Sequence, residues 1–169
     1  MPERNTPKAQ PMLKLFTQFH VLISLLGIVA GFIVVFGMLT GDSVDGWTAF
    51  FLAMTIATSV TGFMFPFQKL LPSHIVGILS LAVLAVTMLA LYTYRLRGIW
   101  RAVYVVGAVI SLYLNVFVLV VQSFLKVPAL HQLAPQGNEP PFAIAQGIVL
   151  LLFIVLGFLA FKRFRPVVA

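Results

Sequence analysis

The residues best suited to chemistry in this chain are its three histidines, because imidazole can bind protons, metals and haem iron near neutral pH. His20 lies six residues after Lys14 in a long apolar run, about 9 Å deeper along a helix. An ionisable side chain inside an apolar run is a candidate for function by default. His74 begins another apolar run, and His131 lies in a proline-rich loop where we expect it to be solvated. His20 and His74 are therefore the candidate pair.

Imidazoles on two different helices could bind the iron of a b-type haem, a quinone or a metal. For His74 the alternative is an interfacial position near a helix N-terminus. The sequence contains no zinc-protease motif, nucleophile elbow or phosphate-binding glycine loop, and it has no cysteine, which excludes disulfides, cysteine-ligated zinc and iron–sulfur clusters. These absences favour a non-catalytic protein.

A second set of candidates consists of amides and hydroxyls at helical spacing. Asn115 stands in the middle of an apolar run, where an amide without a partner is costly. We predict an interior polar track from Ser111 through Asn115 to Gln122, because these residues share one helical face. The track is expected to open beside His20, with Ser24 one turn further along. The alternative for Asn115 is a hydrogen bond that holds two helices together.

Hydroxyl groups and glycines form similar stripes in three other apolar runs. Since a polar side chain facing lipid lacks a partner, we expect these stripes to face the bundle interior. They comprise Thr17, His20, Ser24 and Gly31; Thr48, Thr55, Ser59 and Gly62; and Ser73, Gly77, Ser80 and Thr87. Gly27–Gly31 and Gly37–Gly41 are also G-x-x-x-G matches, which serve close packing within a bundle or between copies.

Five apolar runs must position all of these residues, at roughly 15–40, 47–67, 73–94, 101–125 and 142–161. Each reaches the roughly 20 residues that a membrane-spanning helix requires. The chain is 61% hydrophobic with a mean hydropathy of +1.07, and only 9% of its 169 residues are charged, against about 25% in soluble domains. The sequence predicts an all-α integral membrane bundle of five transmembrane helices with short loops and no soluble domain.

The distribution of charge limits the function further. The net charge of +7 comes from short basic clusters at the ends of the apolar runs, which is typical of headgroup anchors and not of nucleic-acid binding. No predicted span contains Asp or Glu, whereas a proton pump or ion-coupled carrier usually needs a buried acid. The first run exceeds the length of a cleavable signal, so we expect it to be retained. The expected partners are membrane lipid and a lipid-soluble ligand, with a homo-oligomer or membrane-complex subunit as further options.

The basic residues leave the orientation nearly balanced, with five on one side of a five-crossing model and six on the other. The first group is Arg4, Lys8, Lys14, Lys69 and Lys126; the second is Arg95, Arg97, Arg101, Lys162, Arg163 and Arg165. If the second run only dipped into the membrane without crossing it, nine basic residues would lie on one side and two on the other. We favour five crossings with the N-terminus outside and the C-terminus inside, because the two tight basic triads are typical of cytoplasmic anchors.

Three segments carry a family resemblance: Leu71-Pro72-Ser73-His74 with Gly77, the run from Tyr113 to Gln122, and Glu139-Pro140-Pro141-Phe142. They resemble segments of small bacterial polytopic inner-membrane proteins whose function is uncharacterised. The resemblance implies a multi-pass protein of the bacterial inner membrane and carries no site residues.

These patterns support three hypotheses. The first is a non-catalytic bundle that binds a lipid-soluble ligand or a membrane partner at the end that bears the histidines. The second is a b-type haem electron-transfer protein that uses His20 and His74, and the third is a channel or carrier subunit.

Overall fold

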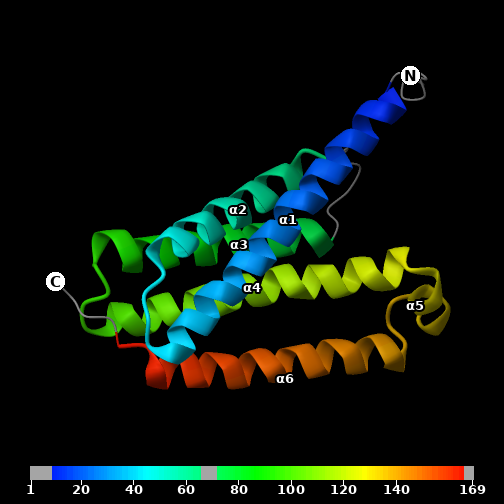
Figure 1. The fold of residues 1–169 in the computed structure, drawn as a ribbon. Coiled ribbons are helices and arrows are strands. Elements are labelled where there is room, and N and C mark those ends of the chain that lie inside the picture. Colours follow the sequence, from blue (N-terminus) through cyan, green and yellow to red (C-terminus); the bar gives the residue numbers. More distant parts are fainter. Residues whose placement is uncertain (1–8, 66–71, 166–169) are drawn as a thin grey trace.

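The computed structural model describes residues 9–65 and 72–165, and within these ranges every regular element is a helix. Five helices are long and apolar enough to cross a membrane (Figure 1). They are α1 (Ala9–Thr40), α2 (Asp45–Phe63), α3 (Pro72–Met88) with its π-helical extension η1 (Leu89–Thr93), α4 (Ile99–Lys126) and α6 (Pro140–Arg163). The all-helical class and the five apolar helices are as predicted.

The helix ends differ from the predicted ones for local reasons. α1 begins at Ala9 and includes Pro11, since proline is tolerated in the first turn, where its missing N–H has no helical partner. α2 ends at Phe63, and the predicted residues 66 and 67 lie outside the described ranges. The long loop after α4 contains a short helix that the sequence analysis did not predict, α5 (Pro128–Leu133), which Pro128 initiates.

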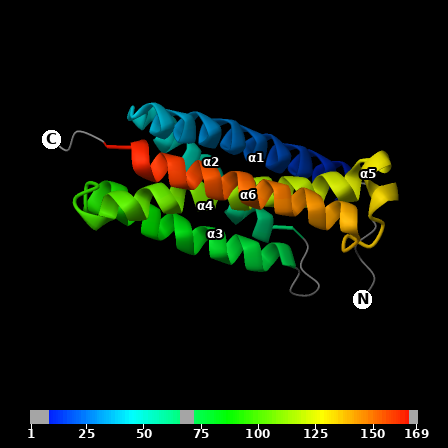
Figure 2. The same ribbon diagram turned by 90° about the horizontal axis from the view of Figure 1, so that it is seen from below.

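α4 is the central helix of the bundle. It packs against α1, α3, α5 and α6, whereas α2 packs mainly against α1 and α3. In the view of Figure 1, α1 is tilted relative to α4 and α6. In the perpendicular view of Figure 2, the long helices all run along the length of the bundle. Buried residues make up 56% of the most apolar window of α4 and only 6% of that of α6, so α6 lies at the periphery.

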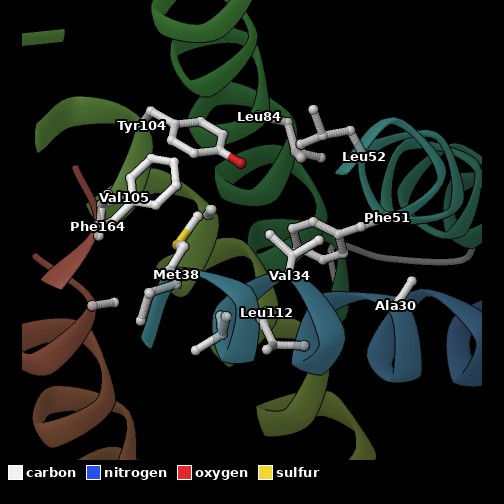
Figure 3. Close-up of a cluster of buried hydrophobic side chains, with 14 of the residues drawn as sticks. Ala30, Val34, Met38, Phe51, Leu52, Leu84, Tyr104, Val105, Leu112 and Phe164 are labelled. Carbon is white, nitrogen blue, oxygen red and sulfur yellow. The ribbon is translucent and has the colours of Figure 1, made fainter. Parts of the chain in front are cut away.

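The hydrophobic core lies between α1, α2, α3 and α4 in the half of the bundle near the α1–α2 turn. Figure 3 shows that Met38, Phe51, Leu84 and Tyr104 point toward a common centre, one residue from each of these helices. Each of the four is at most 3% exposed. The tight packing of these large side chains fixes how the four helices are placed relative to one another.

One G-x-x-x-G match serves packing within the chain. A methyl group placed on Gly27 would lie 3.3 Å from Met54 Cβ, and one on Gly31 would lie 2.6 Å from Leu112 Cδ1. Both glycines therefore let α1 approach α2 and α4 closely, which larger side chains would prevent. Gly41, in the second match, has φ +87° and turns the chain toward α2.

Candidate functional site

α2 is the polar centre of the bundle, because side-chain hydrogen bonds connect it to each of three neighbouring helices. The predicted stripe of Thr48, Thr55 and Ser59 is buried, which confirms that this face points inward. The bonded pairs are Thr48 with Tyr104, Thr55 with Asn115, Ser59 with Ser80, and Thr61 with His20. Each such bond stabilises a membrane bundle by about 0.6 kcal/mol on average.

Asn115 finds its partner on another helix. Its Nδ2 donates to Thr55 Oγ1 at 3.1 Å, and Thr55 Oγ1 in turn donates to the carbonyl of Phe51 at 2.8 Å. The single proton of the threonine hydroxyl and one amide proton of Asn115 therefore both take part in hydrogen bonds. The arrangement is that of a helix–helix contact, the packing alternative for this residue.

The predicted polar track does not extend as expected. Ser111 is fully buried, and its hydroxyl has no hydrogen-bond partner among the described residues. Gln122, which was predicted to lie in the interior, is exposed, so that part of the prediction was wrong. α1 crosses α4 obliquely and the two helices diverge toward this end (Figure 1), which leaves the last turns of α4 uncovered by α1. The interior part of the stripe ends at Asn115.

His20 lies at the α1–α2 contact and is half-buried. Its Nδ1 is 2.7 Å from Thr61 Oγ1, and the same oxygen is 2.7 Å from the carbonyl of Ala57. Thr61 has one hydroxyl proton, and a carbonyl can only accept, so both contacts are hydrogen bonds only when this proton points to Ala57 and His20 Nδ1 donates its own proton to Thr61. We assign His20 this tautomer because it satisfies both contacts. This assignment leaves His20 Nε2 with a lone pair that can accept a hydrogen bond.

Aromatic rings enclose this imidazole on one side. The Phe65 ring meets His20 edge-on, with ring centres 5.1 Å apart, and Phe16 lies 5.0 Å from Phe65 on the same face. Gly62 leaves room beside His20 Cε1, since even a methyl group there would remain at 3.8 Å. Ser24, one turn along α1, donates its proton to the carbonyl of His20 at 2.6 Å. The polar group therefore sits in an apolar and aromatic setting.

His74 occupies a different place. It is only 7% exposed, and its ring packs against Phe63 of α2, with centres 5.9 Å apart. His20 contacts Thr61 of α2 and Phe65, two residues beyond the end of that helix, so the two imidazoles pack against different residues. Within the described residues, no group of three or more His, Cys, Asp or Glu side chains could hold a metal ion. His131 lies on α5 and is exposed.

The sequence analysis missed the role of Thr61. It lies outside the stripe of Thr48, Thr55 and Ser59 and reaches α1 from another side of α2. No local signal pairs it with His20, because the contact spans 41 residues and depends on how the two helices cross.

Comparison of the chain with protein-family models, with curated proteins and with solved structures finds no match.

Proposed function

We propose that this chain is a non-catalytic multi-pass membrane protein, of a bacterial inner membrane, that binds a lipid-soluble ligand through a hydrogen bond to His20. The observation that carries the proposal is the 2.7 Å hydrogen bond between His20 Nδ1 and Thr61 Oγ1, from which the tautomer is assigned. Thr61 accepts the Nδ1 proton, so Nε2 is available as an acceptor at a half-buried position. A neutral ligand with a hydroxyl group supplies the matching donor.

The surroundings of His20 favour a ligand that enters from the lipid. Phe65 packs edge-on against the imidazole and contacts Phe16 in turn. Phe19 and Leu22 of α1 are exposed on the bundle surface. A site with an apolar lining and one oriented polar group is the usual form of a small-molecule site. A hydrogen bond in such a setting is stronger than one in water.

The test uses the full-length protein in lipid nanodiscs, labelled with nitrogen-15 at histidine. The probe is a short-chain alkyl hydroquinone, and the control ligand is its dimethyl ether, which has the same ring and tail but no donor. We expect the hydroquinone to shift the Nε2 resonance of His20 and the ether to leave it unchanged. The proposal would be contradicted if both compounds shifted this resonance equally, or if neither compound shifted it.

Two variants and one control complete the design. His20→Ala should abolish the saturable binding of the hydroquinone. Thr61→Val removes the acceptor that orients the ring, so binding should weaken about tenfold, as expected for one lost hydrogen bond of about 1.4 kcal/mol. His131→Ala, on an exposed residue, should bind as the wild type does. If all three variants bind alike, His20 is not the site.

A further inference from the structure

A second polar feature lies at the opposite end of α3, where η1 leads into α4. A surface hollow of about 530 Å³ is lined there by Thr93, Tyr94, Arg95, Arg97 and Trp100. The rings of Tyr94 and Trp100 stack in parallel, with centres 3.8 Å apart and planes within 2°. Tyrosine and tryptophan are typical of the membrane–water interface, which places this hollow at headgroup level.

The backbone of this turn has an unusual conformation. Arg95 and Leu96 are non-glycine residues with φ of 47° and 57°, a conformation that disfavours L side chains. The turn is held by backbone hydrogen bonds from Leu96 N–H to the carbonyl of Ala90 and from Arg97 N–H to that of Tyr94, both 3.0 Å. The positions from which the two arginines extend are therefore fixed.

The side chains of Arg95 and Arg97 differ from those of other cations at this end, because they have no hydrogen-bond or ion-pair partner among the described residues. Arg101 donates to the carbonyls of Phe161 and Phe164, and Arg163 donates to the carbonyl of Leu39. Lys162 lies over the ring of Phe158 at 4.4 Å.

The acidic residues at this end of the bundle do not neutralise the positive charge of Arg95 and Arg97. Asp42 accepts a hydrogen bond from Thr40, and Asp42 and Asp45 line a separate, smaller hollow beside Tyr104. No ion pair joins either carboxylate to an arginine within 9–65 and 72–165. The two arginines that line the hollow with the stacked rings therefore lack an anion among the described residues.

We propose that this hollow binds the phosphate of an anionic phospholipid headgroup, with Arg95 and Arg97 as its donors. The guanidinium fork matches phosphate oxygens and donates two parallel hydrogen bonds. The stacked Tyr94 and Trp100 form the wall against which the glycerol part of the lipid packs. The site is independent of His20 and lies at the other end of the bundle.

The test measures lipid binding to the full chain in detergent by native mass spectrometry, with phosphatidylglycerol as the probe and phosphatidylcholine as the neutral reference. The variant is Arg95→Gln with Arg97→Gln. The control is Lys162→Gln with Arg165→Gln, which removes the same charge at the same end without touching the hollow. Circular dichroism checks that each variant is folded.

We expect the first pair of substitutions to weaken phosphatidylglycerol binding about thirtyfold, since each basic residue near an anionic surface contributes about 1 kcal/mol. The control pair should change it by less than about threefold. Equal losses in both would show attraction by net charge alone and would overturn the proposal. Displacement of the lipid by millimolar inorganic phosphate would identify a soluble phosphate as the occupant and would also overturn it.

A third variant, Arg95→Lys with Arg97→Lys, keeps the charge and removes the planar fork. It also provides a test of the proposal if the variant with two glutamines does not fold. Binding should fall at least fivefold, because an ammonium group cannot donate two parallel bonds to one phosphate. Binding equal to that of the wild type would show that the hollow does not recognise phosphate through its geometry.

Discussion

Two polar clusters on the same helix, α2, behave differently. At Thr55, deep in the bundle, Asn115 donates to the hydroxyl and the hydroxyl donates to the backbone of its own helix. At Thr61, near the end of α2, His20 donates to a hydroxyl that is bonded in the same way, but the imidazole keeps an acceptor nitrogen at a half-buried position. The first cluster is closed and holds helices together. The second is open and can bind a ligand.

The largest effect is expected where a charge enters the closed cluster. Asn115→Asp should destabilise the bundle by about 2.5–3 kcal/mol, because an acid in the middle of a membrane span costs about that much. Gln122→Glu makes the same chemical change seven residues along α4, at an exposed position near Lys126. It should cost less than about 0.5 kcal/mol. Reversible unfolding in bicelles gives both values, and equal costs would show that Asn115 is not in a closed site.

The next effect concerns the hydrogen bond between Asn115 and Thr55, in which loss of the acceptor should cost more than loss of the donor. Thr55→Val leaves the partly buried Asn115 amide without its acceptor and should cost about 1–3 kcal/mol. Asn115→Leu leaves only a hydroxyl whose proton is already bonded to Phe51, so it should cost less than about 1 kcal/mol. The double variant should recover part of the Thr55→Val loss. A strictly additive double variant would mean that the two side chains do not interact.

A smaller effect of opposite sign is expected at Ser111. Its fully buried hydroxyl has no partner among the described residues, so burial of this group opposes folding. Ser111→Ala should stabilise the bundle by up to about 1 kcal/mol. Ser123→Ala, on the same helix, removes a hydroxyl that is bonded to Leu119 and serves as the control, with a change near zero. A clear loss of stability in Ser111→Ala would reveal a bound water or ligand at this hydroxyl.

The smallest effect concerns the exposed loop before α6, where water screens a third polar cluster. The backbone N–H groups of Gln136 and Asn138 donate to the Glu139 carboxylate and hold its pKa below the ordinary value. A lowered folded-state pKa stabilises the loop above the ordinary pKa of the group, and this contribution is lost as the pH falls through the folded value.

Glu139→Gln should therefore speed the hydrogen exchange of the Gln136 and Asn138 amides at neutral pH. Wild-type and variant rates should converge once the pH falls below the lowered pKa of Glu139, where its carboxylate is protonated in the folded protein. A difference between the two proteins that persists at low pH would show that the charge is not what orders this loop.

The sequence by itself determined the number of long apolar helices and the inward face of α2. Length and hydropathy of an apolar run are local properties, and Thr48, Thr55 and Ser59 share a face in any helix. The same reasoning located His20 and Asn115 as residues that need partners, because polar groups within apolar runs are costly wherever the run is placed.

Only the tertiary structure decided which partners they have. The crossing of α1 over α2 and α4 brings Thr61 to His20 and Thr55 to Asn115, and the divergence of α1 from the last turns of α4 leaves Gln122 exposed. The stacked rings of Tyr94 and Trp100 likewise depend on the turn between η1 and α4. Such contacts depend on crossing angles and on residues far apart in the chain, which helical periodicity does not specify.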